Sequence, residues 1–334
     1  MKMPKRILLV RPDRLGDLIL SLPTAEVLKT EIPGVEVFYM SSRYASEISA
    51  MVDYVDGWMI DDGNDGRRSS LFGLVGNIER GGFDCLIELK PSWRTAAAGF
   101  LARVPVRIGT SRRAYSLFYN RRVNVPRKSS GSHQTDLELA HLKPLGIDGT
   151  GLNPRLKATS GGLARAASLV GSKYKSYIVM HPGSGGSSPN WPRENYVSLA
   201  ASIAANTGFK VVISNHDKNI GEFENCLNLG GRTDLETLAG VLHGAKLFVS
   251  GSTGPLHLAD ALGTPCVSFF PNREDIGAVR WGPRRNMGGV LTPSQLCRCG
   301  GPGSCRCLER ISAAEAFNKI SGVLKAAKSP SVGG

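Results

Sequence analysis

Long hydrophobic runs are missing from this 334-residue chain. No stretch approaches the roughly 18 consecutive apolar residues that a membrane-spanning helix needs. The apolar run at residues 7–10 follows basic residues, but it is far shorter than the roughly 7–15 residues in the apolar core of a secretory signal. We therefore expect a cytoplasmic protein in which residues 7–10 form a first β-strand and the cysteines are reduced.

Aromatic residues are scarce as well, at 7% of the chain, whereas Lys and Arg outnumber Asp and Glu by 41 to 28 and give a formal net charge of +13. This charge predicts an anionic partner, which can be nucleic acid, anionic lipid or a phosphorylated substrate. A surface that stacks RNA bases needs many aromatic side chains among its basic clusters, and this chain has few aromatic residues. We therefore expect no nucleic-acid partner.

Several catalytic motifs are also absent. The chain has no HExxH, no GxSxG, no cluster of paired carboxylates and no Asp-x-Asp pair that would hold a catalytic divalent metal. We therefore expect chemistry that needs no metal ion.

Short apolar runs alternate with helix-length segments along the whole chain, for example the runs at residues 7–10, 35–40 and 177–181. Strands that alternate with helices form βαβ units with parallel sheets, so we predict an α/β fold. Gly, Pro and Thr punctuate residues 146–162, as expected of a linker. We predict two doubly wound domains, residues 1–155 and 156–330, that face each other across a cleft.

A Gly-Asp turn follows the first predicted strand, in the segment VRPDRLGDL of residues 10–18. Gly16 permits a tight turn, and Asp17 stands where a helix begins. Asp17 can cap that helix by accepting from free backbone N–H groups, or it can present a carboxylate that takes a proton from a hydroxyl. Spacing alone favours the cap.

A second loop, HPGSGGSSPNWP at residues 181–192, lies between a predicted strand and a predicted helix. Its small residues Gly183, Ser184 and Gly185 let backbone N–H groups approach an oxyanion. The loop has neither the Gly-Lys-Ser/Thr of a P-loop nor the GxGxxG of a dinucleotide site. The pattern favours a flexible loop and a ligand loop equally.

The third turn, SGSTGPLH at residues 250–257, carries the strongest signal for a ligand. Pro255 suits the first helical position, Ser252 and Thr253 offer hydroxyls near the cap, and His257 can add a donor. The free N–H groups and the dipole of a helix start favour an anion. A capped helix with a surface histidine is the alternative, but all these residue types agree with a phosphate site.

Four cysteines, Cys297, Cys299, Cys305 and Cys307, form the segment CRCGGPGSCRC. Four thiols can hold zinc tetrahedrally, but the usual spacing is C-x2-C and both pairs here are C-x-C. The spacing favours reduced thiols in a surface loop, so we predict no metal site.

Taken together, these segments resemble the ADP-heptose:lipopolysaccharide heptosyltransferases of glycosyltransferase family nine. The resemblance covers roughly residues 5–326, and the order and spacing of the segments make it specific. It is carried by ILLVRPDRLGDLILSLPTAEVLK, FDCLIELKPSWRTAAAGFLARVPVRIG, IVMHPGSGGSSPNWPRENY and GRTDLETLAGVLHGAKLFVSGSTGPLHLADALGTPCVSFF.

The resemblance implies a GT-B fold of two Rossmann-like domains and an inverting, metal-independent glycosyltransferase without a cofactor. The first domain would bind an anionic glycolipid or oligosaccharide acceptor, and the second would bind a nucleotide-sugar donor, ADP-heptose. Asp17 matches the catalytic base of the family, and Thr253, Gly254 and His257 match its diphosphate contacts. The positive charge suits an acceptor at the anionic inner membrane surface, where the protein would make peripheral contact.

Two departures from the family pattern concern the donor site. Many members have Asp at the position of Ser252, and many carry a Lys where Pro189 and Asn190 stand here. The segment HDKNIGEFEN also differs from its usual form, and Glu222 within it is a weak candidate for a ribose contact. A nucleotide-sugar epimerase and a nucleotide-sugar binder without catalytic activity therefore stay open as alternatives.

Two arginines are candidate acceptor contacts. Arg14 and Arg94 follow predicted strands of the first domain, and this position alone suggests that they face an anionic acceptor.

Overall fold

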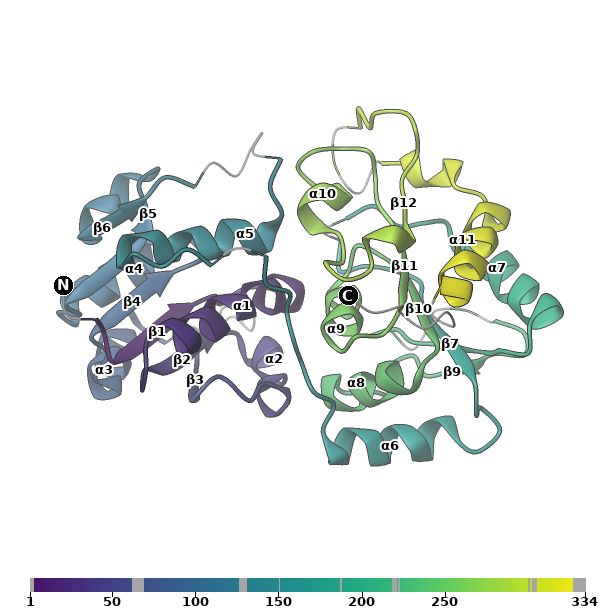
Figure 1. The fold of residues 1–334 in the computed structure, drawn as a ribbon, viewed down its shortest axis with the longest axis horizontal. Coiled ribbons are helices and arrows are strands. Elements are labelled where there is room, and N and C mark those ends of the chain that lie inside the picture. The colour runs from purple at the N-terminus through teal and green to yellow at the C-terminus, as the bar shows by residue number, and fades with distance from the viewer. Residues whose placement is uncertain are drawn as a thin grey trace. The chain divides into compact units, whose positions relative to one another are not determined.

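The computed structural model describes residues 3–61, 69–125, 131–149, 151–186, 188–217, 221, 223–299, 301 and 305–326. The chain divides into two compact units, Met1–Arg155 and Leu156–Gly334 (Figure 1). Each unit contains one six-stranded sheet in which all paired strands are parallel. Among the described residues, no helix combines the length and the apolar character that crossing a membrane requires.

The first unit has the strand order β3-β2-β1-β4-β5-β6. The strands are β1 (Arg6–Val10), β2 (Glu36–Ser41), β3 (Gly57–Ile60), β4 (Cys85–Glu88), β5 (Val106–Thr110) and β6 (Arg121–Val123). The longer helices are α1 (Leu15–Glu31), α3 (Leu71–Gly81), α4 (Trp93–Leu101) and α5 (Gln134–Leu139). Shorter turns are α2 (Arg43–Ser46), η1 (Ser49–Met51), η2 (Ala114–Phe118) and η3 (Ala140–Leu145).

Both faces of this sheet are buried, and the sequence of β1 shows why. Four consecutive apolar residues form the strand after Arg6, and all four are buried. Successive side chains of a strand point to opposite faces, so Leu8 and Val10 pack against α3 and α4, while α1 and α5 contact each other elsewhere in the unit. A near-continuous apolar strand is what a parallel sheet between two helix layers requires.

The second unit has the strand order β12-β11-β10-β7-β8-β9. The strands are β7 (Tyr177–His181), β8 (Lys210–Ile213), β9 (Leu227–Asn228), β10 (Leu247–Gly251), β11 (Cys266–Phe269) and β12 (Val290–Leu291). The helices are α6 (Ser160–Val170), α7 (Arg193–Asn206), α8 (Leu235–Gly244), α9 (Gly254–Ala261), α10 (Ala278–Trp281) and α11 (Ala313–Ala326), with the turns η4 (Met287–Gly289) and η6 (Cys307–Arg310).

One face of the second sheet packs against α7 and α11 through an aromatic cluster. Trp191 stacks on Phe269 at 4.1 Å between ring centroids, and Tyr196 meets Trp191 edge-on at 4.8 Å. Edge-to-face and offset aromatic pairs of this kind each add about 0.5–1.5 kcal/mol beyond their buried area. Because Trp191 ends the loop that follows β7, this cluster anchors that loop to the core.

Each sheet follows the same doubly wound order, in which strands are added first on one side of the first strand and then on its other side. Ligands of such folds bind beyond the carboxyl ends of the two strands at this reversal. These strands are β1 and β4 in the first unit and β7 and β10 in the second. The predicted α/β class with two Rossmann-like domains is confirmed. Residues 160–162 of the predicted linker instead open α6, because Thr159 caps that helix by accepting from the Gly162 N–H.

Candidate functional site

A buried arginine organises the carboxyl end of β1. Arg11 is 1% exposed and contacts three carboxyl groups. Its Nη2 lies 2.6 Å from Asp17 Oδ1, its Nε lies 3.1 Å from Asp13 Oδ1, and its Nη1 lies 3.1 Å from Glu138 Oε1. The same Nη1 donates to the carbonyl of Leu89 at 3.0 Å.

Asp17 does not cap α1. The helix begins at Leu15 with Arg14 at the N-cap position and no side-chain cap, so Asp17 lies within the first turn. The interpretation of Asp17 as an N-cap is therefore wrong, because the helix starts earlier than the sequence indicated. Its side chain is 21% exposed while Arg11 holds one oxygen, which leaves the carboxylate fixed in direction and still accessible.

The charges around Arg11 shift one another's ionisation. Burial lowers the pKa of Arg11, but the attraction of Glu138, Asp13 and Asp17 outweighs burial and raises that pKa above its ordinary value. Burial also raises the pKa of Asp13, against the attraction of Arg11, and Lys90 Nζ lies 3.2 Å from Asp13 Oδ2. Arg11 therefore stays charged as the fixed cation of the cluster.

Arg11, Asp13 and Glu138 were missed at the sequence level. A charged residue directly after a buried strand was a local signal for Arg11. No local signal marks Glu138, which lies on α5 more than a hundred residues away and is fully buried. Only the packing of α5 beside α1 brings it to the site.

A buried carboxyl group ends the neighbouring strand β4. Glu88 accepts hydrogen bonds from the Ser92 N–H at 2.6 Å and from the hydroxyls of Thr95 and Tyr119. Burial raises the pKa of Glu88 to about 8, against these hydrogen bonds. The group is therefore an uncharged structural acid at neutral pH.

The two arginines expected to face the acceptor differ in their surroundings. The Arg94 guanidinium lies 2.6 Å from Asp61 Oδ2 and donates to the carbonyl of Ser69 at 2.6 Å, so it is engaged within its own unit. Arg14 is exposed at the N-terminus of α1. Of the two, Arg14 is the one whose charge reaches solvent.

In the second unit, the loop after β7 adopts a conformation that depends on glycine. Gly183 and Gly186 have φ of 126° and 76°, in the region that side-chain-bearing residues avoid. The Ser184 hydroxyl donates to the Ser188 carbonyl at 3.0 Å, and Asn215 Nδ2 donates to the Pro182 carbonyl at 2.6 Å. These bonds fold the loop and tie it to the end of β8.

This loop lines a cavity of about 780 Å³, within the range of about 300–1,000 Å³ found for small-molecule sites. Gly183, Ser184 and Gly185 all border it, as the ligand-loop interpretation requires. The cavity is also lined by residues that were not predicted as site residues, among them Arg193, Asn215, Asp217 and Glu309. Arg193 places a cation beside the stretch of Pro189 and Asn190 that lacks the lysine of the family pattern.

His181 borders the same cavity as an uncharged ring. Burial lowers its pKa to about 4, and Nδ1 lies 3.1 Å from the Ser214 hydroxyl. The neutral ring adds hydrogen-bonding capacity without charge.

The SGSTGPLH turn lies beside the loop after β7, because Ser250 of β10 pairs with His181 of β7. Thr253 is the N-cap of α9, and its hydroxyl accepts from the Leu256 N–H at 3.3 Å. Gly254 opens the helix, so Pro255 occupies the second helical position. A Cβ added at Gly251 would lie 3.9 Å from the Pro189 carbonyl oxygen, so the two loops lie close to each other.

His257 and Thr253 are buried, so the alternative of a surface histidine is wrong. Ser252 is half-buried. The SGSTGPLH turn does not border the 780 Å³ cavity directly. Glu222, the ribose candidate, lies outside the described residues.

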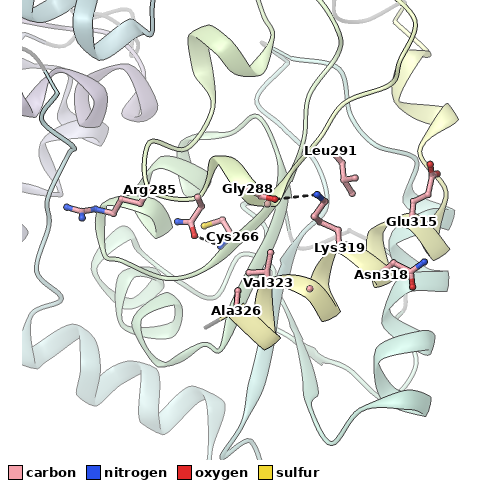
Figure 2. Close-up of a pocket in the computed structure, with 12 residues that line it drawn as sticks. Cys266, Arg285, Gly288, Leu291, Glu315, Asn318, Lys319, Val323 and Ala326 are labelled. Atoms are coloured by element: carbon pink, nitrogen blue, oxygen red, sulfur yellow. Dashed lines mark hydrogen bonds between the residues drawn. The ribbon is translucent and has the colours of Figure 1, made fainter. Parts of the chain in front are cut away.

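Figure 2 shows another cavity of the second unit, about 650 Å³, between the segment at Gly288 and α11. Lys319 points across it and donates to the Gly288 carbonyl at 3.4 Å. Leu291, Val323 and Ala326 give it an aliphatic wall. None of the predicted site residues borders this cavity, whereas Gly183, Ser184 and Gly185 border the cavity of about 780 Å³.

Comparisons with known proteins agree with this arrangement. A family model described as glycosyltransferase family 9 (heptosyltransferase) matches residues 72–296. The chain is 25% identical over 343 residues to a Haemophilus influenzae protein described as a glycosyltransferase, covering 95% of this chain and 96% of that one. It is 25% identical over 314 residues to lipopolysaccharide heptosyltransferase 1 of Salmonella typhimurium, covering 87% and 95%.

The fold is similar to that of ADP-heptose lipopolysaccharide heptosyltransferase II of Escherichia coli, with a TM-score of 0.78 at 18% identity and coverage of 97% and 100%. This similarity confirms the predicted GT-B fold.

Proposed function

The chain belongs to glycosyltransferase family 9, the heptosyltransferase family, and from this membership we propose that it transfers a heptose from ADP-heptose to a lipopolysaccharide core or a related surface glycan. The observation that carries the proposal is the meeting of two ligand loops at one reversal point, beside a cavity of about 780 Å³. In this proposal residues 156–330 bind the donor and residues 1–155 bind the acceptor.

The loop after β7 supplies one half of the diphosphate site. Gly183, Ser184 and Gly185 border the cavity with small side chains, which lets a phosphate approach the backbone N–H groups closely. Arg193 borders it too and supplies the positive charge that the missing family lysine would have given. A guanidinium also binds phosphate in a bidentate manner, which a lysine does not.

The start of α9 supplies the other half of the diphosphate site. Thr253 and Gly254 form the beginning of this helix, whose free N–H groups and positive dipole end favour an anion. Ser252 and His257 flank the same turn and add hydrogen-bonding side chains. Because Ser252 carries no charge where many relatives have Asp, the turn adds no carboxylate of its own to repel the phosphates.

The ribose contact is assigned to the segment after β8. Glu222 stays a candidate from the sequence, and Asp217 of the same segment borders the cavity. A carboxylate that follows the second strand of a doubly wound domain commonly accepts hydrogen bonds from ribose hydroxyls. We assign this role to Asp217 ahead of Glu222.

On the acceptor side, Asp17 acts as the general base. It takes the proton of an acceptor hydroxyl as that oxygen bonds to the anomeric carbon, and the bond to the diphosphate breaks with its electrons passing to ADP. The attack comes from the side opposite the leaving group and inverts the configuration. The loops of the second unit stabilise the charge on the leaving diphosphate, so the step needs neither a metal ion nor a cofactor.

The acceptor is assigned from charge. A formal net charge of +13 favours an anionic glycolipid or oligosaccharide over a neutral one. The same charge supports a cytoplasmic protein that makes peripheral contact with the anionic inner membrane surface. The scarcity of aromatic residues supports the absence of a nucleic-acid partner.

Calorimetric titration with ADP, UDP and GDP tests the donor. We expect binding of ADP and weak or absent binding of the other two. Tight UDP binding without ADP binding would overturn the assignment of ADP-heptose. Transfer to purified heptose-deficient core lipopolysaccharide, followed by mass spectrometry, then tests the acceptor.

Incubation of donor with enzyme alone separates the alternatives. Inversion of the donor sugar without acceptor would identify an epimerase, and binding of ADP-heptose without turnover on any core acceptor would identify a binder without catalytic activity. Transfer that depends on the acceptor supports the proposal.

A further inference from the structure

The four cysteines of the segment after β12 converge on one point. Cys297 and Cys299 lie on one arm of the segment, and Cys305 and Cys307 lie on the other arm, where Cys307 opens η6. All four Sγ atoms lie within 4.8 Å of one another. Two of the sulfur–sulfur contacts join the two arms, at 3.4 Å between Cys297 and Cys305 and 3.7 Å between Cys299 and Cys307. This differs from the loose surface thiols that the sequence favoured.

These distances match the edges of a metal-thiolate tetrahedron. A Zn–S bond of about 2.3 Å places the sulfurs of a regular tetrahedron about 3.8 Å apart. A disulfide would bring two sulfurs to about 2.05 Å. The unusual C-x-C spacing matters little here, because each arm supplies two ligands and all four sulfur atoms meet at one point.

The surroundings of the cluster fit a charged metal centre. Cys297 and Cys305 are buried, whereas Cys299 and Cys307 are half-buried. The Cys297 N–H donates to the Asn272 carbonyl at 2.8 Å. Arg273 donates to the Cys299 carbonyl at 2.8 Å and hydrogen-bonds to the Cys297 thiol.

Three further arginines lie on the same segment, Arg298, Arg306 and Arg310, and two of them border a cavity together with Cys299 and Cys307. A divalent ion with four thiolates carries two negative charges, and Arg298 and Arg310 place positive charge on the same cavity as two of the thiols. The hydrogen bonds of Arg273 to Cys297 and Cys299 are of the kind that orients the ligands of a metal centre.

We propose that Cys297, Cys299, Cys305 and Cys307 bind one thiophilic divalent cation, Zn²⁺, in a closed tetrahedral site. Four protein ligands leave no open position, so the ion is structural and takes no part in sugar transfer. The site does not depend on the proposed function.

The site holds a segment that supports the donor loop. Directly after Cys307, Leu308 and Ile311 enter the core beside Trp191. The Trp191 indole N–H donates to the Ile311 carbonyl at 2.8 Å, and Glu309 borders the 780 Å³ cavity. Loss of the metal would free one end of this segment, so we expect ADP to bind more weakly as a secondary effect.

Elemental analysis of protein purified in reducing buffer without metal affinity steps tests the site directly. We expect one zinc per chain. After removal of the zinc, added Co²⁺ should give the intense charge-transfer and visible bands of tetrahedral cobalt bound to four thiolates. One equivalent of iron in place of zinc would support the site and overturn the zinc assignment.

Variants separate the cluster from other thiols. Cys299→Ser with Cys307→Ser removes two half-buried ligands and should abolish stoichiometric metal, whereas Cys226→Ser, a half-buried thiol elsewhere in the second unit, should keep it. If the double variant does not fold, the cobalt spectrum of the wild-type protein still tests whether four thiolates bind a metal ion. No bound metal and no tetrahedral cobalt spectrum, or two disulfides in the freshly purified protein by mass spectrometry, would overturn the proposal. These readouts do not use transferase activity, so they stand apart from the donor and acceptor assays.

Discussion

The two units share one strand order, yet the residues that follow their first strands have opposite character. After β1, the charged Arg11 gathers three carboxyl groups. In the second unit, β7 ends with the uncharged His181, and the chain continues with glycines and serines. The same strand order therefore presents a carboxylate suited to proton transfer in the first unit and small residues suited to binding an anion in the second unit. The fold fixes where a ligand binds, and the residues beyond the strand ends decide its chemistry.

The largest effect should come from removing the proton acceptor of the first unit. Asp17→Asn should lower the transfer rate by about 10²–10⁴-fold, which is the usual contribution of a general base. Binding of ADP should not change. Single-turnover transfer and calorimetry measure the two quantities. Asp148→Asn, an exposed carboxylate of the same unit, is the control, and an equally fast Asp17→Asn enzyme would show that Asp17 is not the base.

Arg11 should matter next, through stability. Arg11→Met leaves buried carboxyl groups without their cation, and such a change commonly costs about 3–5 kcal/mol. Urea unfolding measures the loss. Arg122→Met, an exposed arginine on β6, should change stability by less than about 0.5 kcal/mol. Equal values for the two variants would contradict a central role for Arg11.

Glu88 should make the protein less stable as pH rises. Its folded pKa of about 8 lies above the ordinary value of 4.5, so its stabilising effect is complete below pH 4.5 and is lost as pH rises through 8. The loss should reach up to about 5 kcal/mol. Glu88→Gln should remove this slope from urea unfolding curves between pH 5 and 8.5, whereas Glu31→Gln, on the exposed surface of α1, should keep it. A slope that survives Glu88→Gln belongs to another group.

His181 should impose the opposite dependence. Its folded pKa of about 4 lies below the ordinary value of 6.5, so its stabilising effect is present above pH 6.5 and is lost as pH falls through 4. The loss should reach up to about 3 kcal/mol. His181→Gln should remove it, and His243→Gln, an exposed histidine on α8, should not. If both variants keep the acid slope, the histidine is not the group responsible.

The smallest effect should come from the glycine loop. Gly183→Ala places a methyl group at a φ of 126°, at a cost of about 1–3 kcal/mol, and should weaken ADP binding by about 10-fold or more. Gly208→Ala has open space and no unusual φ, and it should bind ADP normally. Calorimetric titration with ADP measures the affinity of both variants. Unchanged affinity in Gly183→Ala would remove this loop from the donor site.

Much of this molecule was readable from local pattern. The alternation of apolar runs and helices determined the α/β class, because strand and helix periodicities are short-range properties of the chain. The clustering of Gly, Ser and Thr directly after strands marked both loops of the second unit, because turns need those residue types. The sequence also marked Asp17, although the N-cap of α1 is Arg14, three residues before Asp17.

Tertiary structure alone decided the remaining features, because they join residues far apart in the chain. Glu138 reaches Arg11 only through the packing of α5, and Glu309 and Asn215 reach the cavity of the glycine loop from separate segments. The four cysteines were visible in the sequence as a possible zinc site, but their C-x-C spacing favoured separate reduced thiols. Side-chain periodicity records which face of an element is buried, and it carries no information on which distant element covers that face.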